Sequence, residues 1–357
     1  SGSSLPTARS SGMTTEPMRA LLLTTLLSLL SHPILANPAF EGNWFIDITT
    51  DGAPLMAVLE VERHGDEWKA WIEGGPAPVT VDGDRIVVDV DSRDIRGFIF
   101  IMRLDGTLEN GQITGSYSIH ADATPLLGPG TWVGSPWDPP AYSGEPDPVD
   151  FSGIWKPGPG VDIRKYSMDL TPAAEEWHAG YVMHYDQPGV RCISPGIVAM
   201  VAWGGYPFEV LDAQNRLTFL YEVDSEVRRI FLDDRERPEF YPPSGMGYSL
   251  GRWEGNALVI ETTNMMPNVR DFRGEPISEN AMMHEVYTLS EDGQRLDGVI
   301  TLHDPENYER PPVRRRHWVR DPDIEIYPYE CDPDSFYRQM YNEGKLDMYF
   351  ERSKRRM

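Results

Sequence analysis

Charged side chains interrupt three short apolar runs in the middle of the chain. Arg229, Arg252 and Glu261 each lie among β-branched and aromatic residues, with Tyr248 close by. Inside a poorly hydrated cavity, a paired arginine orients a substrate oxygen or steadies a developing oxyanion, and a buried glutamate serves as general acid or base. Because a lone charge there is costly, such groups are expected to pair. The alternative is a structural ion-pair network that faces outward.

Two further carboxylates belong to this candidate set. Glu285 lies in the run Met282–Leu289, and Asp304 directly follows the run that ends at His303. Since the strands that these runs form are unusually charged, we predict that at least one arginine and one carboxylate converge inside the second of two predicted barrels.

Three histidines on neighbouring runs form a candidate metal site. Register places His284 opposite Thr301 and diagonal to His303, and His317 lies on the next strand. Three imidazoles on adjacent strands can bind zinc and leave one position open for water. The alternative is that these histidines face solvent or make single hydrogen bonds. A divalent metal is thus a possible cofactor, and none is required.

Motifs of well-known enzyme classes are absent from the sequence. It contains no Gly-x-Ser-x-Gly elbow, no phosphate-cradling glycine-rich loop and no His-Glu-x-x-His. Neither cysteine has a Cys-x-x-Cys partner. A serine or cysteine hydrolase is therefore disfavoured, although a catalytic triad needs no local signature.

The charged runs are themselves predicted strands, because they are short, rich in β-branched and aromatic residues and bounded by turns. They are Val227–Leu232, Gly247–Trp253 and Ala257–Asn264. A two-residue Gly255-Asn256 turn sets Arg252 diagonal to Glu261 on one face of the sheet. A three-residue turn that includes Glu254 points Glu261 the other way. The sequence leaves both turns open, and Arg229 is the alternative partner of Glu261.

A Phe-x-Gly-x-Trp pattern occurs twice, as Phe40-Glu41-Gly42-Asn43-Trp44 and as Phe151-Ser152-Gly153-Ile154-Trp155. A Gly-x-Trp on a first strand resembles the start of lipocalin-like (calycin-like) barrels, whose tryptophan plugs the closed end. The alternative is two unrelated strands that begin alike. We expect both tryptophans to be buried at equivalent positions.

Turn and linker signals divide the chain into five regions. They are a leader and signal peptide (1–36), a first β-barrel domain (37–134), a Pro-rich linker (135–150), a second β-barrel domain (151–332) and a C-terminal helix with a basic tail (333–357). Hairpin turns are predicted at His64-Gly65-Asp66, Asp82-Gly83-Asp84, Asp105-Gly106 and Asn110-Gly111. The predicted fold class is all-β, with two tandem antiparallel β-barrels and a few short helices.

The second domain is predicted to contain one helix before its strands begin. Thr171 suits the N-cap and Pro172 the first helical position, and this helix is expected to run to about Met183. The apolar run Ile197–Ala202 is predicted as a strand. A final helix is expected over Ser335–Asn342, with Gly344 ending it.

The N-terminal region and the two cysteines predict an exported protein. Arg19, the apolar run Ala20–Leu30 and a cleavage site after Ala36 make a secretory signal, which places the protein in the periplasm or outside the cell. In an exported chain, Cys192 and Cys331 are expected to form a disulfide. Two buried free thiols are the alternative.

The charge balance limits the partners. A formal net charge of −24 and a pI near 4.6 argue against nucleic acid and against an anionic membrane surface. No segment after the signal region is long and apolar enough to span a bilayer, so we expect no stable membrane insertion. The expected partner is a small molecule.

Four stretches resemble a widespread group of secreted bacterial proteins. They are IFLDDR, MGYSLGRWEGNALVIETT, ITLHDPENYERP and the late YEC. The resemblance covers Phe151 to Asp332. Glu285 and Asp304 match the group's pattern, whereas its members carry Asp at the position of His303. The resemblance implies a domain and an exported location but no reaction.

Two classes of function follow from these observations. The favoured one is an exported enzyme that acts by acid–base chemistry, as a hydrolase or as a hydratase or cyclase, on a small and largely apolar molecule. Some bacterial proteins with paired lipocalin-like domains are such catalysts, which is an analogy at the level of fold. The alternative is a non-catalytic binding protein for a small hydrophobic ligand. A polar cluster deep in the cavity favours the enzyme, and a uniformly apolar cavity favours the binding protein.

Overall fold

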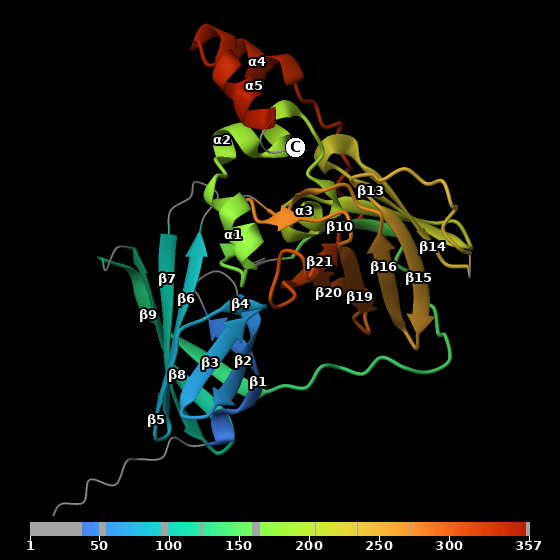
Figure 1. The fold of residues 1–357 in the computed structure, drawn as a ribbon. Helices are drawn as coiled ribbons and strands as arrows, with labels where there is room; N and C mark the ends of the chain where they lie inside the picture. Colours follow the sequence, from blue (N-terminus) through green and yellow to red (C-terminus); the bar gives the residue numbers. More distant parts are fainter. Residues whose placement is uncertain are drawn as a thin grey trace, which may run out of the picture. The chain divides into compact units, whose positions relative to one another are not determined.

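The chain folds mainly into β-strands (Figure 1). The computed structural model describes residues 38–49, 55–93, 99–121, 124–158, 165–203, 205–233, 235–271 and 273–354. The predicted leader and signal peptide, residues 1–36, lie outside these ranges. The described strands form a curled ten-stranded sheet and a closed nine-stranded barrel. The predicted all-β class with two barrel-type units is therefore confirmed.

The first β-unit is a sheet in the order β11-β6-β7-β8-β9-β1-β2-β3-β4, with β5 paired to β6. Its strands follow the short helix η1 (Pro38–Phe40) and are β1 (Gly42–Thr49), β2 (Leu55–His64), β3 (Glu67–Ile72), β4 (Gly75–Pro76), β5 (Val79–Asp82), β6 (Arg85–Arg93), β7 (Ile99–Glu109), β8 (Gln112–Ala121) and β9 (Thr124–Pro136). The tenth strand, β11 (Lys165–Tyr166), follows the linker and pairs with β6. The second part of the chain thus contributes a strand to the first sheet.

Three of the four predicted hairpin turns form. Glu109 pairs with Gln112 across Asn110-Gly111, whose φ angles of 51° and 80° are those that a two-residue hairpin turn requires. The turns at Gly65 and Gly83 form in the same places as predicted. The predicted turn at Asp105-Gly106 is wrong, because both residues lie inside β7. A Cβ on Gly106 would meet the Trp132 ring at 2.6 Å, so glycine serves close packing there.

The second β-unit is a barrel whose strands join in a closed ring. They are β10 (Gly153–Pro157), β12 (Phe208–Asp212), β13 (Arg216–Tyr221), β14 (Val227–Phe231), β15 (Tyr248–Glu254), β16 (Ala257–Thr263), β19 (Met282–Leu289), β20 (Arg295–His303) and β21 (Val313–Arg320). Neighbouring strands are antiparallel except β14 and β15, which are parallel and are joined by the long connection 232–247. A separate hairpin consists of β17 (Asn268–Val269) and β18 (Pro276–Ile277).

The two Phe-x-Gly-x-Trp segments have matching structures. Trp44 and Trp155 are 4% and 0% exposed, and each indole Nε1 donates a 2.8 Å hydrogen bond to the carbonyl of the phenylalanine four residues earlier. Gly42 and Gly153 both adopt positive φ, at 129° and 115°, which favours glycine. Both segments open the first strand of their unit, so the prediction of equivalent, buried tryptophans is confirmed.

Large side chains fill the barrel interior. Trp155, Phe219, Tyr287 and Trp318 point inward, and each is at most 3% exposed. Their rings contact one another, for example Tyr287 with Trp318 at 6.0 Å between centroids. A void of about 20 Å³ remains between the rings of Tyr287 and Trp318 and the helical residues Met200 and Val201, which is room for about one water molecule. The interior is thus packed rather than hollow at this end.

In the ranges that the structure describes, five α-helices accompany the β-units. They are α1 (Pro172–Ala179), α2 (Met183–Asp186), α3 (Gly196–Trp203), α4 (Pro333–Asn342) and α5 (Leu346–Lys354), with 3-10 turns η2 (Pro188–Arg191) and η3 (Val223–Ser225). The Thr171 hydroxyl caps α1 as predicted, by accepting from the Ala174 amide at 3.3 Å. The prediction of a strand over Ile197–Ala202 is wrong, because this run forms α3. A short apolar run buried on all sides carries no period that separates helix from strand.

Candidate functional site

The predicted Arg252–Glu261 pair forms, but on the outer surface of the barrel. Glu254 pairs with Ala257, so the two-residue Gly255-Asn256 turn is the one adopted. Arg252 Nη1 donates to Glu261 Oε1 at 2.9 Å. Their side chains are 52% and 45% exposed. The predicted interior position of both residues is therefore wrong, and an exposed pair of this kind contributes little to stability or chemistry.

Arg229 and Tyr248 also lie outside the barrel interior. Arg229 is exposed, whereas its neighbours Arg228 and Ile230 are buried. Tyr248 is 4% exposed because the connection 232–247 covers the outer face of β15, where its hydroxyl donates to the Glu236 carbonyl at 3.4 Å. The assignment of these two residues to the interior is wrong: the face of β14 that carries Arg229 is open to solvent, whereas both faces of β15 are partly covered. On β15, apolar alternation consequently does not distinguish the two faces.

Glu285 points into the barrel and pairs with Arg228, which the sequence prediction missed. The Glu285 side chain accepts from both Arg228 terminal nitrogens, at 3.1 Å for Nη1, and from the Tyr287 hydroxyl at 2.8 Å. Arg228 also donates to Ser249 Oγ at 3.0 Å and to Thr262 Oγ1 at 2.7 Å. Both charged side chains are at most 1% exposed. The expectation that an arginine and a carboxylate converge inside the second barrel is thus met, through a different arginine.

Burial and charge set the protonation of this interior cluster. Burial opposes the charge on Arg228, but attraction to Glu285 outweighs it and holds the pKa of Arg228 above its ordinary value. Burial raises the pKa of Tyr221 to about 12, and burial together with Glu285 raises the pKa of Tyr287 well above its ordinary value. Both phenols are therefore protonated at neutral pH, and that of Tyr287 donates to Glu285. Because both carboxylate oxygens of Glu285 accept from Arg228, Glu285 acts here as a structural hydrogen-bond acceptor.

Asp304 holds a turn at the end of β20 rather than facing the barrel interior. It is 2% exposed and accepts from the Ser278 amide and hydroxyl, both at 2.8 Å, and from Asn307 Nδ2 at 2.8 Å. These bonds join the segments on either side of β19 and β20. Because both of its carboxylate oxygens accept hydrogen bonds from this turn region, Asp304 stabilises the turn.

The three histidines do not form the predicted metal site. His284 lies opposite Thr301 and diagonal to His303, as predicted, and all three histidines are on the outer face of the barrel. His317, however, lies opposite Asp297, six residues from His303 along β20. Within the part of the chain that the structure describes, no group of three or more His, Cys, Asp or Glu residues is arranged to hold a metal ion.

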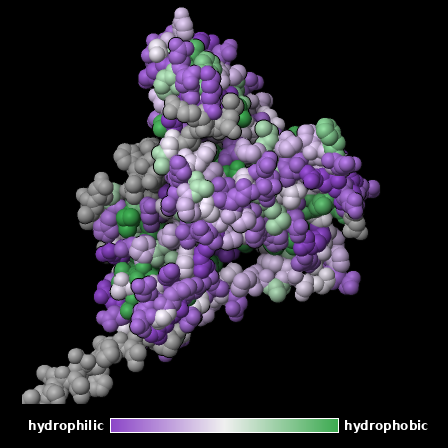
Figure 2. Space-filling view, in the orientation of Figure 1, coloured by the Kyte–Doolittle hydropathy of each residue, from purple (hydrophilic) through white to green (hydrophobic). Residues whose placement is uncertain are grey.

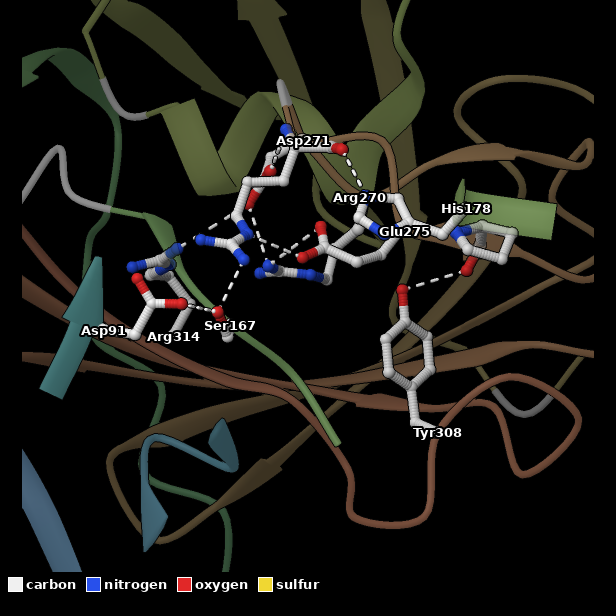
Figure 3. A network of polar contacts seen from close by, with 10 residues as sticks. Asp91, Ser167, His178, Arg270, Asp271, Glu275, Tyr308 and Arg314 are labelled. Atoms are coloured by element: carbon white, nitrogen blue, oxygen red, sulfur yellow. Dashed lines mark hydrogen bonds and ion pairs between the residues drawn. The ribbon is translucent and has the colours of Figure 1, made fainter. Parts of the chain in front are cut away.

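A second buried charge cluster occupies the turn between β17 and β18 (Figure 3). Arg270 contacts Asp271 at 3.0 Å and Glu275 at 3.3 Å, and Arg273 contacts Glu275 at 2.8 Å. Arg314, an interior residue of β21, lies 3.9 Å from Asp271. All five side chains are at most 8% exposed. The β17–β18 hairpin is short and has little apolar core of its own, so these buried ion pairs help to connect its two ends.

This cluster extends to both β-units. Arg273 Nη2 donates to Ser167 Oγ at 2.6 Å, and Ser167 in turn bonds Asp91 of β6. The Arg273 carbonyl bonds His178 Nε2 of α1 at 2.6 Å, and the Tyr308 hydroxyl donates to the Pro276 carbonyl at 2.9 Å. The β17–β18 hairpin is therefore fixed at several points (Figure 3). Such an element can serve as a rigid wall for a neighbouring site.

A cleft with a volume of about 510 Å³ opens beside this hairpin. Val269 and Ile277 of the hairpin form part of it, and both are nearly buried. Aromatic side chains from α1, α2, α4 and α5 also line it; they are Trp177, Tyr185, Tyr337, Tyr349 and Phe350. We refer to this site as the C-terminal cleft. Its volume and its aromatic walls match those of small-molecule sites.

Covalent and ionic contacts hold the C-terminal helices beside the cleft. The predicted Cys192–Cys331 disulfide is present and joins the end of η2 to the residue before the α4 cap, with 5.8 Å between the Cα atoms. Arg352 of α5 bonds both carboxylate oxygens of Asp186, through Nε at 2.8 Å and through Nη2. Phe336 and Met340 pack with Tyr349 in a small hydrophobic cluster. Figure 1 shows α4 and α5 stacked as a helical pair at the end of the chain.

Sequence reasoning missed the C-terminal cleft. Its residues come from three separate segments, 177–191, 267–277 and 337–353, and none of these has a local motif. The helix α5 lies in the region that was predicted as a basic tail. The one available signal was the density of aromatic residues after Cys331, which is more than a solvent-exposed tail requires.

Comparison of the chain with family models gives no match, and comparison with curated proteins gives none either. The resemblance to a group of secreted bacterial proteins therefore stays a prediction. Among the described residues, no helix has both the length and the apolar character needed to cross a membrane. The face drawn in Figure 2 is mostly hydrophilic, with small scattered hydrophobic areas.

Proposed function

We propose that this chain is an exported protein that binds a small, largely apolar molecule in the C-terminal cleft and catalyses no reaction on it. The observation that carries the proposal is the cleft itself. It has a volume of about 510 Å³ and walls of five aromatic side chains, and a charge-clamped hairpin forms one side. Aromatic side chains supply large apolar contact areas and have few rotatable bonds, so they lose little conformational entropy when a ligand packs against them.

The titratable groups of the cleft favour binding over acid–base catalysis. Asp186 is already bound by Arg352 and by the Val182 amide at 2.7 Å. Burial raises the pKa of Tyr349, so its phenol stays protonated at neutral pH. A general base needs a free lone pair near the pH at which it works. Neither side chain meets that requirement.

The proposed location rests on the predicted signal peptide together with the disulfide. Disulfides persist mainly in oxidising compartments. The Cys192–Cys331 bond is therefore consistent with the periplasm or the exterior of the cell. The acidic charge of the chain speaks against nucleic acid as a partner, and a small molecule stays the proposed one.

Fluorescence titration with N-phenyl-1-naphthylamine, a neutral aromatic probe, tests the proposal. Ser353 lines the cleft from α5, and Ser353→Trp should fill it and weaken probe binding by about 10-fold or more. The matched control is Glu351→Trp, which adds the same ring to the same helix at an exposed position outside the cleft. It should leave the affinity unchanged.

Two results would overturn the proposal. One is the absence of saturable probe binding to the wild-type protein. The other is equal weakening by both tryptophan variants, which would place the bound probe elsewhere or indicate a general disturbance of α5. Circular dichroism of both variants checks that the fold is retained.

The acid–base enzyme expected from the sequence is the second candidate. Tyr287 and Glu285 support it, because the Tyr287 ring borders the 20 Å³ void and its hydroxyl bonds the carboxylate. The screen uses chromogenic esters, phosphotriesters and glycosides, with and without a chelator. Any hit should fall in Tyr287→Phe by about 10²-fold or more if Tyr287 moves a proton. An unchanged rate in this variant would separate the activity from the barrel interior.

A further inference from the structure

Arg191 places an incompletely used guanidinium in the C-terminal cleft. Its Nη1 donates to the Tyr349 hydroxyl at 3.2 Å and its Nη2 to the Asp186 carbonyl at 3.4 Å. Its Nε–H is buried and bonds none of the residues that the structure describes. A guanidinium carries five N–H donors. Three of them are therefore without an acceptor among the described residues.

The absence of a carboxylate partner sets Arg191 apart from Arg352 and from the arginines of the two buried charge clusters. Arg228 pairs with Glu285, and Arg352 pairs with Asp186. Arg191 forms no ion pair with any carboxylate that the structure describes, although the chain has 56 acidic and only 32 basic residues. A partly buried cation without a counter-charge is costly unless a ligand supplies one.

The immediate surroundings of Arg191 favour an anion rather than a cation. Both of its bonds are to neutral oxygens, which leave its positive charge uncompensated. Asp186, a carboxylate that lines the cleft, is paired with Arg352 and so does not cancel that charge. The charges elsewhere on this acidic chain act over a longer range, and salt screens them beyond about 8–10 Å.

We propose that the ligand of the C-terminal cleft is a small aromatic acid. Its anionic group bonds the guanidinium of Arg191, and its ring packs against Tyr337, Tyr349 and Phe350. This inference rests on the proposed binding function and adds the chemical class of the ligand. A planar guanidinium suits an oxyanion because two parallel N–H groups can reach two oxygens at once. Arg191 is then a specificity-determining residue.

A matched pair of probes tests the inference. 1-Anilinonaphthalene-8-sulfonate and N-phenyl-1-naphthylamine share one aromatic skeleton and differ by the anionic group. In fluorescence titrations, Arg191→Met should weaken binding of the sulfonate about 10–100-fold and binding of the neutral probe less than about 3-fold. Arg191→Lys, which keeps the charge but loses the fork, should fall between. The matched control is Arg229→Met, on the outer surface of the barrel and outside the cleft.

The outcomes separate this inference from the proposed function. If the wild-type protein binds the neutral probe as tightly as the sulfonate, or if Arg191→Met weakens both equally, the ligand is not an acid and the binding function stands. If neither probe binds, both proposals fail. The thermal midpoint and the mass of the unreduced protein show whether each variant keeps its fold and its disulfide. Should Arg191→Met lose them, an unchanged sulfonate affinity in a folded Arg191→Lys refutes the fork geometry.

Discussion

Replacing Glu285 by Gln should destabilise the second barrel far more than the size of the change suggests. The substitution keeps the shape of the side chain and an oxygen that can accept from Tyr287, so it leaves no cavity. It removes the negative charge that faces Arg228, whose side chain is 1% exposed. The guanidinium would then lie in the barrel interior with only the hydroxyls of Ser249 and Thr262 and one neutral amide as partners.

The magnitude follows from the burial of the pair. Removing one partner of a buried ion pair costs about 3–5 kcal/mol, because the other charge is left uncompensated. The chain offers a matched control in Glu261, which also pairs with an arginine but has a side chain 45% exposed. For such a surface pair, Glu261→Gln should cost less than about 1 kcal/mol. The same chemical change on neighbouring strands thus has two very different expected outcomes.

Urea denaturation followed by tryptophan fluorescence measures both variants. The midpoint should fall strongly for Glu285→Gln and hardly for Glu261→Gln, with the slope of the transition unchanged. Adding Arg228→Met to Glu285→Gln should recover much of the lost stability, since it removes the buried cation. Equal midpoints for the two single variants, or a double variant less stable than Glu285→Gln, would refute the electrostatic explanation.

Three further outcomes are expected. Gly153→Ala should lower the thermal midpoint more than Gly42→Ala. Both substitutions place alanine at positive φ, at a cost of about 1–3 kcal/mol, but only the Cβ at position 153 also lies 3.0 Å from an arginine side chain. Equal decreases in the midpoint would contradict this explanation. The denatured, unreduced protein should contain no titratable thiol. Replacing both Cys192 and Cys331 by Ser should weaken binding of the neutral fluorescent probe in the cleft. Unchanged affinity would show that α4 and α5 do not need the disulfide to form the cleft. Burial, together with the neighbouring His284, lowers the pKa of His303, so below about pH 6.5 the unfolded chain binds more protons than the folded one. The free energy of unfolding should therefore fall on acidification through this pH. His303→Gln should reduce this dependence of unfolding free energy on pH, and an identical dependence would exclude a contribution from His303.

Alternation along the strands was predictable, but the face that points inward was predictable only in part. Glu285 was only a further candidate, although its parity with Met283 and Tyr287 on β19 is a signal for the inward face that it occupies. On β14 the two consecutive arginines made the same pattern fit either face, and the structure turns Arg228 inward. Parity with the buried Ile230 is the signal that favours Arg228.

The remaining features depend on contacts between distant segments. The disulfide was predictable from cysteine count and compartment, and the buried tryptophans from a repeated pattern. The C-terminal cleft was not, because it exists only after three separate segments meet. Helix α5 was missed for a related reason, since its buried Tyr349 packs against a neighbouring helix and leaves little apolar period to read.

The bond between Cys192 and Cys331 also has a consequence for the order of events during folding. It links residues 139 positions apart, and most strands of the second barrel lie between them. During synthesis from the N-terminus, Cys192 emerges well before its partner. The walls of the cleft therefore come together last, after the strands that support them are available. An oxidising compartment would complete the C-terminal cleft, whereas cytosolic expression would give barrels whose last helices lack this covalent tether.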